Sequence, residues 1–266
     1  MVDYVLAIPS YKREKTIQKK TLKLLDEHNI SPEKVVIFVA NDEEKENYSK
    51  ELQNHKYGKN IVVGVPTIGA QRNFIENYYP EGTKLMMFDD DLNGVYIKKD
   101  KSLVPIDNLE KDFIEKGFML CAEKNAKCFG LYAAANHFFM KHRIYESLCY
   151  IPGGTFGVIV EHNEFLKRRL NHGEDYEYSI RQYVHNGILV RFDDITIKSA
   201  FFKEPGGLQT IRTKQYIYDS IKEIQDTFPE LCKMYIRKST GNAELRLRDN
   251  AEQKGRLMYK IRTKKS

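Results

Sequence analysis

The fold of this chain is decided by the stretch KLMMFDDDL, residues 84–92, in which a short apolar run ends in three consecutive carboxylates. Adjacent carboxylates repel one another by roughly 1 kcal/mol or more per pair, so the end of a buried strand is a costly place for them without a cation. Alternation along an extended chain would point Asp89 and Asp91 to the same side. Carboxylate oxygens suit Mg²⁺ and Mn²⁺, so we expect Asp89 and Asp91 to hold such an ion. The alternative is an acidic turn at the protein surface.

Before this stretch, apolar and amphipathic segments alternate along the chain. We expect strands at Tyr4–Pro9, Lys34–Ala40 and Ile61–Val65, and helices at Lys15–His28, Asp42–Leu52 and Gly69–Tyr79. Alternation at this spacing predicts parallel strands joined by crossover helices. Ligands bind outside the carboxyl ends of such strands, so the polar residues after the first, second and fourth strands should converge on one crevice.

The second half of the chain is less regular. There we expect helices at Asp107–Lys127, Gly173–His185 and Thr213–Phe228, and strands at Phe129–Ala133, Thr155–Val160, Ile188–Phe192 and Ile195–Phe202. The sequence contains no internal repeat, low-complexity tract or linker, and its 266 residues are 41% hydrophobic. These features predict an α/β fold with a single domain.

The net charge of +6 comes from the C-terminal segment. Residues 233–266 contain 11 Lys or Arg against 3 Asp or Glu. Such a segment can bind a polyanion, or it can be a solvated chain end.

Cysteine usage and hydropathy both favour a soluble protein of the cytoplasm. The four cysteines form no CxxC pair and are expected to be free and buried, as in a reducing compartment. No apolar run approaches the ~18 residues that cross a bilayer, and the N-terminal apolar run is too short for a signal peptide. We therefore expect no membrane partner.

Two further segments carry groups suited to proton transfer or phosphate binding. In HGEDYEY, residues 172–178, Gly173 would allow a tight turn that places Glu174 and Asp175 in the first turn of a helix, where the dipole favours their ionised forms. An ionised carboxylate there could take a proton from an attacking hydroxyl, or the segment is an ordinary acidic helix start. In GAQRN, residues 69–73, Gly69 begins a helix and Arg72 follows one turn later, which suits a phosphate or a nucleotide.

The segment KEPGGLQ, residues 203–209, has paired glycines that can turn backbone N–H groups toward an anion, or it is a plain connection. Patterns typical of zinc hydrolases, dinucleotide folds, P-loops and α/β-hydrolases do not occur in the sequence.

The segments IPSYKR (residues 8–13), GAQRN, the aspartate triplet and GED (residues 173–175) follow the order found in glycosyltransferases of the GT-A fold. The chain resembles that family from about Tyr4 to Phe202. The resemblance implies a mixed sheet flanked by helices, and a nucleoside-diphosphate sugar donor bound with Mn²⁺ or Mg²⁺. It implies a GT-A domain, which we expect over residues 1–230. The charge distribution adds a basic segment over residues 231–266 that packs on this domain or extends from it.

The resemblance also implies roles for individual residues. It places the nucleotide base and ribose against Pro9, Ser10, Tyr11, Arg13 and Asp42. Further donor contacts are expected from Gly69, Arg72, Asp89, Asp90, Gly153, Gly154 and Lys203. Asp91 and Asp89 would hold the metal, and Asp175, with Glu174 beside it, would act as the base of an inverting transfer. The stretch Ser199–Glu204 lacks the His that many members use as a metal ligand. Either Glu204 or a water would take its place, or Lys203 would neutralise the diphosphate directly.

More narrowly, the SYKR and GAQRN segments look like small phage and viral glycosyltransferases that modify hydroxymethylated bases in DNA. That likeness implies a phage- or virus-encoded enzyme that transfers a hexose such as glucose from UDP-glucose, with DNA held by the basic C-terminal segment. Three alternatives stay open: a glycan or protein acceptor, a nucleotidyltransferase with the same paired aspartates, and a non-catalytic nucleic-acid-binding protein.

Overall fold

The structure, a computed structural model, describes residues 3–199, 213–249 and 259. The strands are β1 (Val5–Pro9), β2 (Val35–Val39), β3 (Ile61–Val63), β4 (Lys84–Phe88), β5 (Leu92–Lys99), β6 (Ser102–Pro105), β7 (Cys128–Tyr132), β8 (Ile144–Glu146), β9 (Thr155–Ile159), β10 (Val190–Ser199), β11 (Cys232–Ile236) and β12 (Ala243–Leu247). The longer helices are α3 (Asp42–Glu51), α4 (Ile68–Tyr78), α5 (Lys116–Lys124), α6 (Glu174–Asn186) and α7 (Lys214–Thr227).

The first helix is continuous but not uniform. It runs through α1 (Glu14–Ile17), the π-helical turn η1 (Gln18–Leu22) and α2 (Lys23–Glu27). A second π-helical segment, η3 (Glu110–Glu115), leads into α5, and the short 3₁₀ helices are η2 (Pro32–Lys34) and η4 (Glu164–Leu166).

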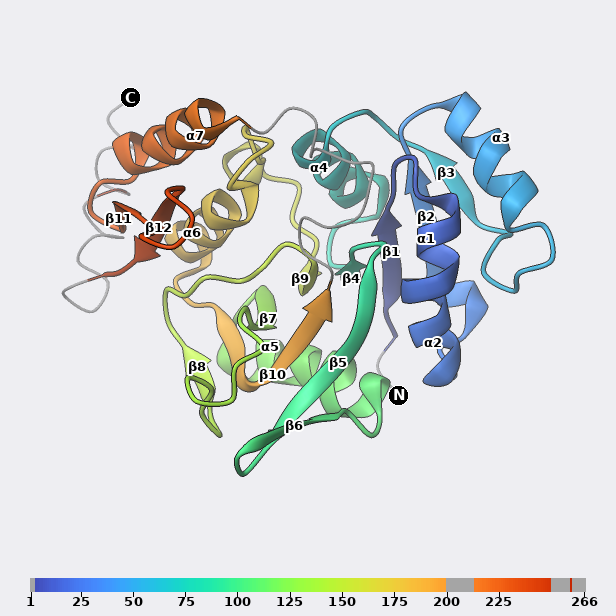
Figure 1. The fold of residues 1–266 in the computed structure, drawn as a ribbon, viewed down its shortest axis with the longest axis horizontal. Helices are drawn as coiled ribbons and strands as arrows, with labels where there is room; N and C mark the ends of the chain where they lie inside the picture. Colours follow the sequence, from blue (N-terminus) through green and yellow to red (C-terminus); the bar gives the residue numbers. More distant parts are fainter. Residues whose placement is uncertain (1–2, 200–212, 250–258, 260–266) are drawn as a thin grey trace.

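One mixed sheet organises the molecule. Its strand order is β3-β2-β1-β4-β9-β7-β10-β5-β6, with β8 paired to β10. Strands β3, β2, β1 and β4 are parallel, and their carboxyl ends meet at one edge (Figure 1). Strand β9 runs antiparallel to β4, so the residues that precede β9 lie at the same edge as those that follow β4. This arrangement brings Gly154 to Asp89, whose N–H donates to the Gly154 carbonyl at 2.8 Å.

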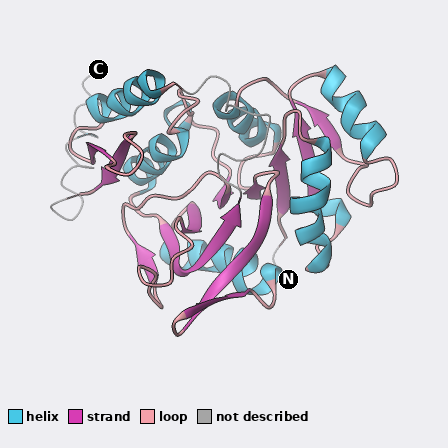
Figure 2. Cartoon of the chain, in the orientation of Figure 1, coloured by secondary structure: helices cyan, strands magenta, loops and turns pink. Residues whose placement is uncertain are grey.

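Alternate residues of the central strands pack into two apolar cores on opposite faces of the sheet. In β4, Met86 and Phe88 join the core that also contains residues of α1, α2, α3 and α5. Leu85 and Met87 join the second core, with residues of α4, α6 and α7. Helices therefore cover both faces of the sheet (Figure 2), which confirms the expected α/β architecture of a mixed sheet flanked by helices in a single domain.

The structure corrects two expectations for the second half of the chain. The expected strands Ile188–Phe192 and Ile195–Phe202 form one strand, β10, whose register against β7 shifts between Phe192 and Thr196. The remainder of the second segment lies outside the described residues. The β5–β6 and β11–β12 hairpins were not predicted, although the alternating apolar and polar residues of β12 are typical of a half-buried strand.

The expectation for cysteines is confirmed: all four are free and buried. Among the residues that the structure describes, no helix is long and apolar enough to span a bilayer.

Candidate active site

The ends of β1 and β4 are joined through Ser10. Its hydroxyl donates to Asp90 Oδ2 at 2.6 Å and shares a second hydrogen bond with the Tyr48 hydroxyl, also at 2.6 Å. Ser10 and Tyr48 are both buried. The strand-end segments after β1 and β4 therefore converge, as the sequence predicted.

Arg13 binds the same acidic turn. Its Nη1 lies 2.9 Å from Asp90 Oδ1 and 3.6 Å from Asp91 Oδ2. Burial raises the pKa of Asp90 to about 6, although the Arg13 charge and the Ser10 hydrogen bond oppose the rise. The expected alternation of Asp89 and Asp91 does not apply, because the chain turns at Asp90 and Asp91 and does not stay extended.

Arg72 connects the acidic turn to helix α6. Its side chain is only 2% exposed, Nη2 donates to Asp89 Oδ1 at 2.8 Å, and Nη1 donates to Glu174 Oε1 at 2.6 Å. Asp89 follows β4 and Glu174 begins α6, so one buried guanidinium ties two elements together. Removing one partner of such a pair costs roughly 3–5 kcal/mol, because the other charge is left uncompensated.

The glycines before β9 leave room for this connection. A Cβ atom on Gly153 would lie 2.3 Å from Arg72 Nη1, and one on Gly154 would lie 3.0 Å from Asp89 Oδ2. Any side chain at Gly153 would displace the guanidinium, so the pair Gly153-Gly154 borders both the Arg72 bridge and the exposed side of Asp89.

The two acidic residues at the start of α6 differ in environment. Gly173 precedes them with φ of 73°, a left-handed turn of the kind expected from the sequence. Glu174 is buried against Arg72, and burial, then the Asp175 charge, raises the pKa of Glu174 to about 7. Asp175 is partly exposed and accepts a hydrogen bond from the Tyr150 hydroxyl at 2.5 Å. Of the two carboxylates, Asp175 is therefore the one that a second molecule can reach.

The residues expected at the nucleotide lie around the end of β1. Pro9 is buried in the strand, whereas Tyr11 is 40% exposed. Lys12 adopts φ of 54°, and its N–H donates to the buried Glu44 carboxylate at 2.7 Å. Asp42 is exposed in the first turn of α3.

Gly69 contacts the polypeptide at the start of α4. Its N–H donates to Asn171 Oδ1 at 3.2 Å, and a Cβ atom there would lie 2.3 Å from the Leu170 carbonyl oxygen. Gly69 therefore allows close packing between α4 and the segment that leads into α6.

Carboxylate oxygens, the ligands that Mg²⁺ and Mn²⁺ prefer, remain partly accessible in the acidic turn. The Asp89 side chain is 36% exposed, compared with 14% for Asp91. No group of three or more His, Cys, Asp or Glu is arranged to hold a metal within the part of the chain that the structure describes. Mg²⁺ commonly takes only one or two carboxylates and completes its coordination with waters and substrate phosphates, so two aspartates are a sufficient protein contribution.

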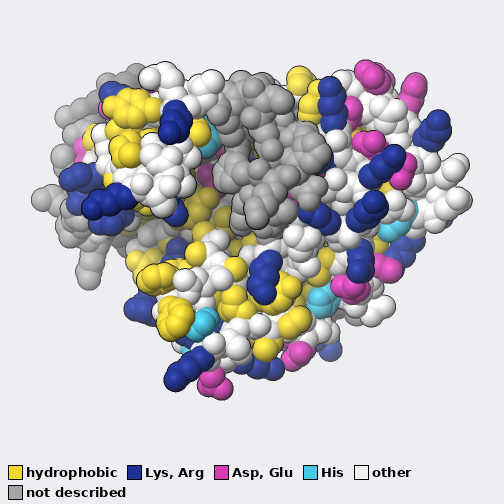
Figure 3. All heavy atoms as spheres, viewed as in Figure 1, with side chains coloured by type: hydrophobic (Ala, Val, Ile, Leu, Met, Phe, Trp, Pro, Cys, Tyr) yellow, Lys and Arg dark blue, Asp and Glu magenta, His cyan; other side chains and the backbone are white. Residues whose placement is uncertain are grey.

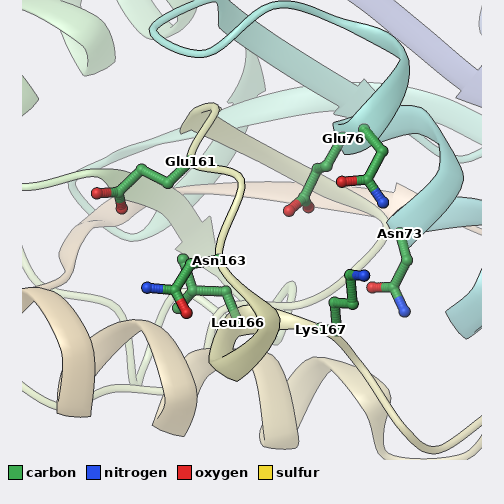
Figure 4. A pocket seen from close by; sticks show the side chains of 7 residues that line it. Asn73, Glu76, Glu161, Asn163, Leu166 and Lys167 are labelled. Carbon is green, nitrogen blue, oxygen red and sulfur yellow. The ribbon is translucent and has the colours of Figure 1, made fainter.

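Lys203, expected at the diphosphate, lies outside the described residues. A small polar hollow between α4 and residues 161–167 is lined by Asn73, Glu76 and Lys167 among others, and by none of the residues expected to bind donor or metal or to act as the base (Figure 4).

Sequence reasoning missed three residues that hold the site: Tyr48, Tyr150 and Thr21, whose hydroxyl donates to the Asp89 carbonyl oxygen. Tyr48 and Tyr150 lie far in sequence from the groups they contact, and only the fold brings them together. Thr21 carried a local signal, because it is a polar residue on the apolar face of a predicted helix.

No family model matches the chain, and no curated protein matches it significantly in sequence. The fold is similar to that of Staphylococcus aureus TarS in complex with UDP-GlcNAc, with a TM-score of 0.58 and 14% identity over 98% of this chain and 72% of the other. It is also similar to glucosyl-3-phosphoglycerate synthase from Mycobacterium tuberculosis in complex with Mn²⁺, UDP-glucose and phosphoglyceric acid, with a TM-score of 0.52 and 10% identity over 92% of this chain and 86% of the other.

A third similar structure is the mannosyltransferase PcManGT from Pyrobaculum calidifontis in complex with GDP-Man and Mn²⁺. Its TM-score is 0.53, at 13% identity over 83% of this chain and 63% of the other. At these identities the likeness concerns the fold, and it confirms the GT-A-like architecture that the sequence segments predicted.

Proposed function

We propose that this chain is a glycosyltransferase that moves a sugar from a nucleoside-diphosphate sugar to an acceptor hydroxyl. The observation that carries the proposal is the Asp89–Arg72–Glu174 bridge. It holds an acidic turn suited to a metal-bound diphosphate beside the helix start that presents Asp175. Similar structures bind UDP-GlcNAc, UDP-glucose with Mn²⁺, and GDP-Man with Mn²⁺, which supports the same donor class here.

The donor would lie across the strand ends. Tyr11, Arg13 and Asp42 would contact the nucleotide, with UDP-glucose as the proposed donor, and Asp89 and Asp91 would hold Mn²⁺ or Mg²⁺. When bound, the ion supplies positive charge that stabilises the departing diphosphate. Gly69 and Arg72 would act by positioning neighbouring groups, because Gly69 is packed against the Leu170 carbonyl and the Arg72 side chain is only 2% exposed.

In the proposed reaction, the acceptor oxygen forms a bond to the anomeric carbon while the bond from that carbon to the diphosphate breaks. The acceptor proton passes to Asp175, whose side chain accepts a hydrogen bond from the Tyr150 hydroxyl. Attack from the face opposite the leaving group inverts the anomeric centre. Glu174 would assist by fixing Arg72, so that the base and the acidic turn keep their separation.

The test is Asp175→Asn, assayed by release of nucleoside diphosphate from the sugar donor. Loss of the base should lower turnover by roughly 10²-fold or more. Glu164→Gln, which neutralises a carboxylate that is 86% exposed, is the matched control and should behave as the wild-type protein. Near-normal turnover in Asp175→Asn would remove this residue from the role, and release of pyrophosphate would identify a nucleotidyltransferase instead.

For the acceptor, we propose DNA with a hydroxymethylated or already glycosylated base, bound through the basic C-terminal segment. The β11–β12 hairpin has one apolar face, with Cys232, Ala243 and Leu245 buried in the core that includes α7. Side chains alternate along a strand, so Lys233 and Arg246, which pair in register, point the other way and are exposed. Lys and Arg side chains gather over this hairpin at the left edge of Figure 3.

The hairpin also lies near the proposed base. Burial raises the pKa of Tyr176, and the charges of Asp175 and Glu244 add to the rise, so β12 lies within electrostatic reach of α6.

The acceptor proposal is tested with Lys233→Gln combined with Arg246→Gln. Deleting the whole segment would remove the hairpin and expose the apolar residues of α7 that it covers. Loss of two phosphate contacts should weaken DNA binding and reduce the slope of log affinity against log salt by about 2. Lys101→Gln, on the β5–β6 connection, is the control. An unchanged salt slope, with full activity on a glycan or protein acceptor, would contradict DNA as the acceptor.

A further inference from the structure

Thr21 occupies an unusual position in the first helix. It lies on the same face as Ile17, Leu24 and Leu25, which are buried in the core, and it is itself 0% exposed. An apolar residue would be expected there. The helix is π-helical from Gln18 to Leu22, and single π turns inside α-helices occur often at functional sites.

The Thr21 hydroxyl binds the backbone on both sides of the acidic turn. It donates to the Asp89 carbonyl oxygen at 2.7 Å and accepts from the Leu92 N–H at 3.0 Å. The two residues between these contacts are Asp90 and Asp91. A single hydroxyl thus closes the backbone loop that carries the three carboxylates, from a helix more than sixty residues away in sequence.

The other contacts of the turn involve side chains. Arg72 holds Asp89, and Ser10 and Arg13 hold Asp90. These groups orient individual carboxylates, whereas Thr21 fixes the path of the main chain from which they project. Because Leu92 is 0% exposed, water cannot replace the hydroxyl as a partner for its N–H.

We infer that Thr21 is a positioning residue for metal and diphosphate binding, and that it acts by clamping the backbone of the acidic turn. The inference rests on the proposed function, because it assigns the turn to the metal-bound donor. Serine keeps the hydroxyl and can make both contacts. Valine has nearly the same shape and can make neither, so it would leave the turn free to open around Asp90 and Asp91.

The experiment is calorimetric titration of UDP, and separately of GDP, in the presence of Mn²⁺. Thr21→Val should weaken nucleotide binding by about tenfold or more, the equivalent of one lost hydrogen bond near a charged group. Thr21→Ser should restore wild-type affinity. Thr21→Cys, with only a weak donor, should bind with intermediate affinity and provides a second readout if the valine variant does not fold.

Thr196→Val is the matched control for general destabilisation. Thr196 is also 0% exposed and its hydroxyl donates to the Tyr132 carbonyl at 2.8 Å, in β10 and away from the turn. It should lower the melting temperature without weakening nucleotide binding. The inference would be overturned if Thr21→Val and Thr21→Cys both bound nucleotide with the affinity of the wild-type protein. It would also be overturned if Thr21→Val and Thr196→Val lost the same amount of nucleotide affinity. Either result would leave the proposed function standing. If the wild-type protein binds neither nucleotide with Mn²⁺, the proposed function fails as well.

Discussion

Replacing Gly153 by alanine should disrupt the bridge between the acidic turn and helix α6. The new Cβ atom would lie 2.3 Å from Arg72 Nη1 and 2.9 Å from Arg72 Cζ, whereas ordinary contacts begin at 3.4 Å. The guanidinium must therefore retreat by at least about 1 Å. Gly153 does not have a positive φ, so alanine brings no backbone strain and the effect is steric alone.

The retreat should break one of the two charged hydrogen bonds of Arg72. Each such bond contributes about 1.5–3 kcal/mol, so we expect a loss of about 2 kcal/mol and a melting temperature lower by roughly 4–8 °C. Turnover should fall at least about tenfold, because Asp89 and Glu174 lose their common partner. Both quantities are measured on the same preparation, by thermal unfolding and by release of nucleoside diphosphate.

Gly154→Ala is the control next along the chain. Its Cβ atom would lie 3.0 Å from Asp89 Oδ2, a milder contact with the end of a partly exposed side chain, so a smaller effect is expected. A double-mutant cycle adds a direct test of the cause: in an Arg72→Gln background, Gly153→Ala should cost much less. Full stability and activity in Gly153→Ala would refute the argument, as would equal effects with and without Arg72.

Two further outcomes are expected. Tyr150→Phe removes the hydrogen bond to Asp175, so kcat should fall about tenfold while the KM for the donor stays unchanged. A change confined to KM would instead assign Tyr150 to donor binding. Burial raises the pKa of Glu174 from 4.5 to about 7, so the unfolded chain releases this proton at a lower pH than the folded protein does. The free energy of unfolding should therefore fall as the pH rises from about 4.5 to 7. Melting temperatures of Glu174→Gln over that range should show a smaller decline than those of the wild-type protein, and identical slopes would contradict the shift.

Much of the first half of the fold could be predicted from the sequence, because its strands are short apolar runs separated by helices of clear periodicity. The segment at residues 84–92 also located the carboxyl edge of the sheet, since charge directly after a buried strand has few explanations. The second half was harder to interpret. Strand β10 contains Asp193 and Asp194 in its interior, and they suggested a break because buried carboxylates are rare. The structure pairs Asp193 with Arg191 in the same strand and with Arg143, which lies fifty residues earlier and is not predicted by any local pattern.

The chemistry of the site was only partly predictable for the same reason. The types of residue at the strand ends indicated which groups would gather there, but not which would be exposed. Arg72 was expected to face a phosphate and is instead buried between Asp89 and Glu174. Its environment depends on Gly153, some eighty residues later, so its burial follows from tertiary packing that sequence periodicity does not describe.

Alternate side chains of β4 pack into two different cores, and this limits which insertions the strand can accept. Inserting one residue at the start of this strand would turn Leu85 and Met87 to the face that Met86 and Phe88 now fill. Met86 and Phe88 would turn to the opposite face, so each pair would meet a core of the wrong shape. It would also rotate the following carboxylates to the opposite side of the sheet. An insertion of two residues preserves the sidedness of every side chain and should be the less damaging change. Altered chain lengths engineered into this protein are therefore better placed in the β5–β6 connection than in any strand that leads to the acidic turn.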